Sequence, residues 1–262
     1  KKIGIVGTPN VGKSVIFNQL TGSQQIIGNW PGKTVERAEG LLHFNGYDAV
    51  IVDLPGIYSM STFSLEELVS REYIAQEKPD VIINVIGAAV LERNLFFTIQ
   101  LMEMGVPMVV CLNQMDLAEG QGIAIDAKKL EALLGLPVVP TVAAKGKGIP
   151  ELMATAIRVA ECKREPIYNS IRFSKTVEAD TEDLARQIES AHLDTEYPSR
   201  WLAIKLLEGD ANVKGLIRQQ SDSLLQASES LSNKMEELHK QPGYVVMASE
   251  RYSLAGGIAR DV

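Results

Sequence analysis

The segment GTPNVGKS, residues 7–14, combines residue types and spacing that indicate a defined chemistry. It fits the pattern G-x-x-x-x-G-K-[ST] and directly follows the apolar run IGIV. The two glycines let the backbone turn so that its N–H groups face an anion at the start of the next helix. Lys13 would place a positive charge on the β- and γ-phosphates, and Ser14 would offer a hydroxyl to Mg²⁺. We expect a phosphate-binding loop whose nucleotide contacts come from Gly7, Thr8, Pro9, Asn10, Val11, Gly12, Lys13, Ser14 and Val15.

The segment DLPGIYS, residues 53–59, follows another apolar run and contains Asp-x-x-Gly. Asp53 would stand behind the Mg²⁺ site at a strand end, and Gly56 would donate its backbone N–H to the γ-phosphate. Taken alone, the segment is better explained as a strand-ending aspartate before a Pro-Gly turn, and the phosphate loop favours the functional interpretation. Ile57 has no side-chain group that could orient an attacking water. We therefore expect backbone groups of residues 28–34, around Thr34, to hold that water.

Thr34 belongs to GNWPGKTVE, residues 28–36, a Gly/Pro-rich stretch that predicts a loop between the first helix and the second strand. Its hydroxyl would reach Mg²⁺ when a triphosphate is bound, although most loop threonines have no such role. Trp30 is expected to be a packing or surface aromatic of the same loop.

The segment NQMD, residues 113–116, ends another apolar run and could select the base. The Asp116 carboxylate can accept hydrogen bonds from N1–H and the 2-amino group of guanine, and adenine has neither donor there. An unpaired buried carboxylate costs about 1–3 kcal/mol or more, so this residue favours guanine nucleotides. Asn113 would tie the segment to the phosphate loop, and the stem of Gln114 would cover the base where lysine is common. A polar loop at a strand end is the alternative interpretation.

The segment TVAAKGKG, residues 141–148, could complete the base site. A backbone N–H near Ala143 could reach the guanine O6. Related motifs read Ser-Ala-Lys, and Val142 stands in the place of the serine. A basic turn before a helix explains the segment equally well. Our expected contacts here are Val142, Ala143 and Ala144.

The elements that must position these segments follow an α/β pattern. Apolar runs rich in Val and Ile predict buried strands at 3–6, 49–54, 81–86, 108–113 and 138–142. Helix-period stretches near 65–76, 92–104 and 126–134 alternate with several of them, which predicts a mostly parallel sheet with helices on both faces. Residues 40–44 and 49–54 flank Asn45-Gly46, a hairpin signal that predicts one antiparallel edge pair.

The pattern changes near KREPIYNS, residues 163–170. Beyond it, YVVMA (244–248) is the only short strand candidate, and apolar residues recur at helical spacing instead. We expect a small all-helical domain, with the chain divided into residues 1–165 and 166–262. The helical stripes are Leu184, Ile188 and Ala191; Val213, Leu216, Ile217, Gln220 and Leu224; and Leu231, Met235 and Leu238.

The composition is that of a globular protein, with 262 residues, 45% hydrophobic and a net charge of −7. This balance disfavours a broad basic footprint for nucleic acid. Cys111 and Cys162 have no metal spacing and are expected to be reduced thiols. No apolar run approaches the ~20 residues of a membrane helix and no signal peptide opens the chain, so we expect a soluble segment. The chain begins without Met and ends abruptly at IARDV, from which we expect a fragment of a longer protein.

These motifs, in this order, are similar to the GTP-binding domains of the translation-factor-related class. A closer resemblance is to the ferrous iron transport protein B (FeoB) family. It covers residues 2–165 and, more weakly, the helical part after 166, and AGGIARDV lies where the family's linker to its membrane region would be. The segments that carry it are GTPNVGKSVIFNQLTG, GNWPGKTVE, DLPGIYS, LERNLFFTIQL and NQMD.

The resemblance implies a P-loop GTPase module at the cytoplasmic face of the inner membrane, joined to a transmembrane iron-permease region of the same chain. It implies a helical domain that stabilises bound GDP, and K⁺ held by Asn10 together with backbone carbonyls of residues 28–34. GTP, GDP and a second copy of the chain are the expected partners, and nucleic acid is not. On this basis we expect Mg²⁺ at Ser14, Thr34 and Asp53, K⁺ at Asn10, and catalytic roles for Lys13, Thr34, Gly56 and Asn10.

Two departures from the family pattern predict altered contacts and unusual nucleotide affinity or turnover. One is Val142, and the other is the run Gly87, Ala88, Ala89 and Val90, where an Asp-Ala-Thr-Asn-like run is expected. A soluble GTPase switch for ribosome or RNA assembly is an alternative, which the acidic EADTEDLARQIES disfavours. The helical domain could also serve chiefly as an oligomerisation surface. No His/Cys/carboxylate cluster suits Fe²⁺, so we expect any iron path to lie outside this sequence.

Overall fold

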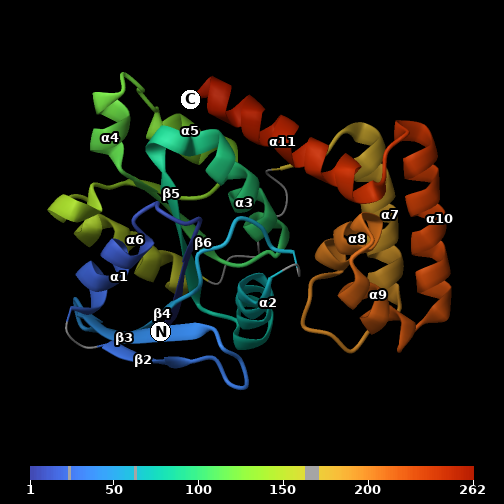
Figure 1. Ribbon diagram of the computed structural model, residues 1–262, viewed down its shortest axis with the longest axis horizontal. Coiled ribbons are helices and arrows are strands. Elements are labelled where there is room, and N and C mark those ends of the chain that lie inside the picture. Colours follow the sequence, from blue (N-terminus) through green and yellow to red (C-terminus); the bar gives the residue numbers. More distant parts are fainter. Residues whose placement is uncertain (23–24, 62–63, 163–170) are drawn as a thin grey trace. The chain divides into compact units, whose positions relative to one another are not determined.

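The computed structural model describes residues 1–22, 25–61, 64–162 and 171–262, which form two compact units (Figure 1). The first unit comprises Lys1–Ser170 with Ile258–Val262, and the second comprises Ile171–Gly257. The predicted change of domain near residues 163–170 lies outside the described residues.

The first unit is built on a seven-stranded sheet in the order β2-β3-β4-β1-β5-β6-β7. Neighbouring strands are parallel from β4 to β7, while β3 is antiparallel to both β2 and β4. The predicted α/β fold, with a mostly parallel sheet and an antiparallel edge, is confirmed. The strands are β1 (Lys2–Gly7), β2 (Gln25–Asn29), β3 (Glu36–Phe44), β4 (Tyr47–Asp53), β5 (Val81–Gly87), β6 (Met108–Asn113) and β7 (Val138–Pro140).

The antiparallel edge contains one predicted and one unpredicted feature. Asn45 and Gly46 both have positive φ (49° and 83°), as the predicted tight hairpin between β3 and β4 requires. Strand β2 was not predicted, and residues 28, 29 and 36, which we placed in a loop, belong to β2 and β3. Both isoleucines of β2, Ile26 and Ile27, are exposed on this edge strand, so no buried apolar run marked it.

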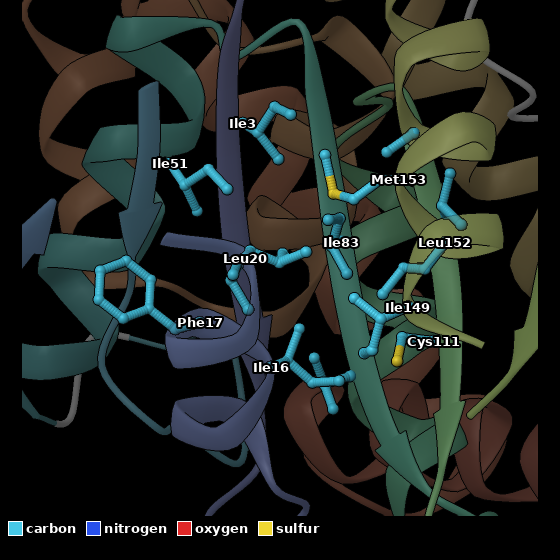
Figure 2. Packing of buried hydrophobic residues seen from close by; sticks show 14 of the residues in the cluster. Ile3, Ile16, Phe17, Leu20, Ile51, Ile83, Cys111, Ile149, Leu152 and Met153 are labelled. Carbon is cyan, nitrogen blue, oxygen red and sulfur yellow. The ribbon is translucent and has the colours of Figure 1, made fainter. Parts of the chain in front are cut away.

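Helices cover the sheet and hold the loops in place. Figure 2 shows α1 and α6 contributing apolar side chains to one core with β1, β4, β5 and β6. Each fully buried residue of this kind stabilises the unit by about 1.5–3 kcal/mol, so the start of α1 is firmly anchored. The helices are α1 (Lys13–Thr21), α2 (Leu65–Glu72), α3 (Leu91–Glu103), α4 (Met115–Gly120), α5 (Ala127–Leu134) and α6 (Ile149–Glu161). Three shorter turns are the π-helical η1 (Tyr73–Glu77) and the 3₁₀ turns η2 (Ala88–Val90) and η3 (Ala143–Lys145).

The second unit is all-helical, as predicted. Helix α8 is its centre, because Trp201 and six consecutive residues after it are buried. The predicted strand at 244–248 is wrong. These residues lie in α11, which begins directly after Pro242, where proline favours helix initiation. The helices are α7 (Lys175–Ser190), α8 (Ser199–Glu208), α9 (Ala211–Arg218), α10 (Asp222–His239) and α11 (Gly243–Asp261).

All three predicted helical stripes need correction. Ala191, the last member of the first stripe, is exposed directly after the end of α7. The stripe from Val213 to Leu224 is divided between α9 and α10, because Ser221 caps the start of α10 by accepting a hydrogen bond from Leu224 N–H. Leu238, assigned to the buried stripe of α10, is 61% exposed in the last turn of that helix.

A buried ionic cluster joins α8 to α11 within the second unit. Glu208 forms ion pairs with Arg251 and with Lys205, the latter at 2.8 Å between Nζ and Oε2. Burial alone would raise the pKa of Glu208, but the two cations outweigh burial and lower the pKa to about 2. The carboxylate is therefore ionised in the folded protein over most of the pH range.

Candidate nucleotide-binding site

The phosphate loop lies between β1 and α1, in the strand-to-helix context that its sequence predicted. Its two motif positions, Gly7 and Gly12, have no room for a side chain. A Cβ at Gly7 would lie 2.6 Å from the Val85 carbonyl oxygen, and one at Gly12 would lie 2.4 Å from Asn113 Nδ2. Gly12 also has a φ of 88°, which L side chains rarely adopt. The loop is thus closely packed against the ends of two other strands.

Lys13, at the start of α1, forms an ion pair with Asp53 at the end of β4. Strand register explains the meeting, because Asp53 lies opposite Ile5 in the neighbouring strand β1, which leads into the loop. Burial raises the pKa of Asp53, although the Lys13 ammonium acts in the opposite direction. A partly buried carboxylate of this kind would be stabilised in its ionised form by a further cation beside it.

The segment that contains Ile57 is bound along the end of β1. Leu54 N–H donates to the Ile5 carbonyl at 3.0 Å and Ile57 N–H donates to the Gly7 carbonyl at 3.3 Å. The Ile57 side chain is 3% exposed, so it belongs to the core. Gly56 is exposed and lies beside Pro9 of the phosphate loop, where a Cβ would lie 3.5 Å from Pro9 Cγ.

Replacing Ile57 with glutamine is expected to change the rate of any nucleotide hydrolysis by less than about twofold. The isoleucine is buried, so an amide there cannot face the phosphate loop without local rearrangement. The substitution would instead lower the free energy of unfolding by about 1–3 kcal/mol, because a buried amide lacks hydrogen-bond partners in the core. Hydrolysis assays and urea denaturation measure the two effects. A large gain in rate would show that a water-orienting group is simply missing from the native site.

The predicted loop that contains Thr34 is shorter than expected and well packed. Trp30 N–H donates to the Val35 carbonyl and Lys33 N–H donates to the Trp30 carbonyl, both at 2.9 Å, which closes residues 30–35 into a turn. The Trp30 ring is buried, as expected of a packing aromatic, and meets Tyr73 edge to face at 5.5 Å. Thr34 is exposed in this turn.

Asn113 connects three parts of the site. Its Nδ2 donates to the Val11 carbonyl at 2.9 Å, which is the expected link to the phosphate loop. Its Oδ1 accepts from Ala143 N–H at 3.0 Å and from Thr141 Oγ1 at 2.9 Å. The sequence prediction missed Thr141, whose only signal was a polar residue within the apolar run 138–142. Burial raises the pKa of the adjacent Cys111 thiol to about 12, so this cysteine stays protonated.

Asp116 is exposed and already has a partner. Its Oδ2 lies 2.9 Å from Lys145 Nζ, and its Oδ1 accepts from Leu117 N–H at 3.0 Å. The hydrogen bond from Lys145 lowers the pKa of Asp116, so the carboxylate is ionised at neutral pH. Because Ala143 N–H donates to Asn113, the exposed Ala144 is the better candidate donor for the guanine O6.

The donor set fits Mg²⁺, which takes few protein ligands and keeps several waters or phosphate oxygens. Asp53 supplies one carboxylate whose partial burial favours a neighbouring cation. Ser14, which could supply a hydroxyl, directly follows Lys13, the ion-pair partner of Asp53. In the described part of the chain, no group of three or more His, Cys, Asp or Glu residues could hold a metal ion.

Comparisons with known proteins identify the family of this arrangement. A family profile described as "Ferrous iron transport protein B" matches residues 1–156. The chain belongs to the ferrous iron transport protein B family. A second profile of this family, "FeoB cytosolic helical domain", matches residues 173–262. The chain therefore carries the G domain of a ferrous iron transporter family, followed by its helical domain.

Individual FeoB proteins support the same assignment. The chain is 42% identical over 230 residues to a Porphyromonas gingivalis Fe²⁺ transport protein A/Fe²⁺ transporter FeoB fusion protein, over 85% of this chain and 27% of that protein. It is 38% identical to the Escherichia coli K12 Fe²⁺ transporter FeoB, over 90% of this chain and 30% of that protein. It thus spans less than a third of either relative.

A solved FeoB structure shows the same fold. NFeoB from S. thermophilus, bound to GDP·AlF₄⁻ and K⁺, is 35% identical and superposes with a TM-score of 0.87 over 99% of each chain. Within residues 1–22, 25–61, 64–162 and 171–262, no helix combines the length and apolar character that crossing a bilayer requires.

Proposed function

We propose that this chain binds GTP and GDP, hydrolyses GTP slowly with Mg²⁺, and thereby regulates Fe²⁺ uptake by a transmembrane iron-permease region of the longer protein. The observation that carries the proposal is the hydrogen-bonded bridge of Asn113. It joins the phosphate loop to the two segments suited to reading a base, so one nucleotide can contact all three. The S. thermophilus neighbour bound to GDP·AlF₄⁻ supports the same conclusion.

The phosphates would be held by the backbone N–H groups of residues 7–15 at the start of α1. Lys13 would exchange its Asp53 partner for the β- and γ-phosphates, and the released carboxylate would face the Mg²⁺ site with Ser14 and Thr34. Bound Mg²⁺ would neutralise negative charge that develops on the phosphate oxygens. Gly56, which lies against Pro9, would offer its N–H to the γ-phosphate.

The base would lie beside Asp116, which would exchange Lys145 for the N1–H and 2-amino group of guanine. Ala144 N–H would donate to O6, and Val142 and Ala143 would form the wall of this part of the site. Val142 is buried, and its N–H and carbonyl both form hydrogen bonds within the turn, with Lys145 and Lys147. Val142 therefore has no free polar group that could take the place of the serine hydroxyl.

Hydrolysis would be an in-line attack of water on the γ-phosphate, with the water held by backbone groups of residues 28–34 around Thr34. Asn10 is exposed at the phosphate loop and would hold K⁺ with carbonyls of the same residues. Bound K⁺ would add positive charge beside the phosphates. The K⁺ in the S. thermophilus neighbour supports this assignment.

Wild-type protein with Mg²⁺ is expected to hydrolyse GTP, but not ATP, about tenfold faster in potassium chloride than in sodium chloride, the factor for one lost charge contact of about 1.4 kcal/mol. Asn10→Ala should remove the difference because it removes the proposed side-chain ligand. Phosphate release in the two salts measures the effect, and GTP affinity in each salt shows whether binding changes too. Equal rates in both salts for wild type and variant would exclude a role for K⁺.

Regulation of iron uptake rests on family membership and on relatives that are named as Fe²⁺ transporters. The helical unit would stabilise bound GDP, and assembly into oligomers would be a further property of the longer protein. In cells, iron uptake by the full-length protein should fall when Lys13 is replaced by alanine. Unchanged uptake with abolished GTP hydrolysis would show that the two activities are independent. Among the residues that the structure describes, no feature favours the RNA-assembly alternative.

A further inference from the structure

Gln114 does not extend freely beside the base site but contacts the phosphate loop. Its Nε2 donates a hydrogen bond to the Asn10 backbone carbonyl at 3.0 Å. Both residues have left-handed backbones, with φ of 61° for Gln114 and 69° for Asn10. Non-glycine residues rarely adopt this conformation, and when they do they cluster at functional sites. The bond therefore joins two strained points on loops that are 104 residues apart in the chain.

Gly87, at the end of β5, leaves the room that this contact needs. Its φ and ψ are −88° and 123°, which any residue can adopt. A glycine is therefore needed here because it has no side chain, and not because of its backbone conformation. A Cβ at this position would lie 3.0 Å from Gln114 Oε1 and 3.2 Å from Val90 Cγ2. The Asn10 carbonyl can only accept, so the amide must turn its nitrogen to Asn10 and its oxygen towards Gly87. A side chain at 87 would push on that oxygen.

We propose that Gln114 is a positioning residue that fastens the base-reading loop to the phosphate loop through Asn10, and that Gly87 permits this contact. The inference rests on the proposed function, because it assigns a role within the same guanine-nucleotide site. Asn113 provides a buried connection to Val11. Gln114 adds a second, exposed connection, one residue later in its own loop and one residue earlier in the phosphate loop. The two loops must separate for a nucleotide to leave, so the second connection slows release of GDP.

The release rate of a fluorescent GDP analogue, measured by stopped flow on the whole chain, tests the proposal. Gln114→Met keeps the length of the stem but has no donor, and should release GDP about two- to tenfold faster, the factor for one hydrogen bond. Gln114→Lys keeps a donor and should stay close to wild type. Gln121→Met, at an exposed glutamine just beyond α4, is the matched control and should have no effect. The thermal midpoint should be the same for all three variants.

A double-variant cycle with Gly87→Ala gives the sharper test. Gly87→Ala should also speed GDP release, and it should add little in the Gln114→Met background, because the contact it disturbs is already absent. Additive effects, or a Gln114→Lys variant as fast as Gln114→Met, would overturn the proposal. The proposal would also be overturned if wild-type protein bound GDP and the Gln114→Met variant released it at the wild-type rate. Wild-type protein that binds no GDP would instead overturn the proposed function.

Discussion

Replacing Asp116 with asparagine is expected to reverse the base preference of the site from guanine to xanthine. The carboxylate can accept from N1–H and the 2-amino group of guanine, whereas an amide presents a donor that suits the 2-carbonyl of xanthine. Loss of a charge-assisted hydrogen bond lowers affinity by about ten- to hundredfold, so GTP binding should weaken by that factor or more. Titration with GTP and with xanthosine triphosphate measures both sides of the exchange.

The same substitution should hardly alter the fold, because Asp116 is exposed and its only charged partner in the described chain, Lys145, is exposed too. Such surface pairs contribute about 0–1 kcal/mol. Asp48→Asn removes another surface carboxylate, more exposed than Asp116, from the β3–β4 hairpin and should leave both nucleotide affinities unchanged. If Asp116→Asn bound GTP as tightly as wild type, the base assignment would be wrong.

Arg251→Met is expected to lower the free energy of unfolding of the helical unit by about 3–5 kcal/mol. Arg251 is 2% exposed, and its replacement takes one of two paired cations, Arg251 and Lys205, away from the buried Glu208. Removing one member of a buried ionic cluster leaves uncompensated charge, which costs far more than the loss of a surface pair. Urea denaturation followed by circular dichroism measures the loss. Arg186→Met, in an exposed pair with Asp183, is the control and should cost less than about 1 kcal/mol.

The same cluster should make stability depend on pH in a defined direction. The pKa of Glu208 is lowered from 4.5 to about 2, so its ionised form is stabilised by folding. That contribution is complete above pH 4.5 and is lost as the pH falls towards 2. The stability difference between wild type and Glu208→Gln should therefore shrink by about 3 kcal/mol over this range. A difference that stayed constant down to pH 2 would contradict the lowered pKa.

The chemistry of the site could be predicted from sequence where a motif is local. Residues 7–14 carry both the glycines that permit the turn and the Lys13 that follows it, so one short segment specifies the loop. Ala143 shows the limit, since its N–H is used by Asn113, a contact across 30 residues that no local pattern contains. Strand β2 escaped prediction for another reason. Its isoleucines are exposed at the sheet edge. The strand is therefore held by backbone hydrogen bonds to β3 and not by burial of apolar side chains.

Helix boundaries in the second unit were harder to predict than helix content. Apolar spacing continues from α9 into α10 as though they were one helix, and only the hydrogen bond that caps α10 at Ser221 separates them. A capping serine looks like any other polar residue in a sequence, because its role depends on the backbone angles of its neighbours.

The packing of Trp30 gives the protein its own optical probe. The sequence contains two tryptophans, and the other, Trp201, is fully buried in the helical unit. A Trp201→Phe variant would leave a single indole, placed 4.5 Å from the Arg37 guanidinium and edge to face with Tyr73. Its emission would change whenever the turn that contains Thr34 moved away from these neighbours. Nucleotide-driven movement of that turn could then be followed in real time without attaching a dye.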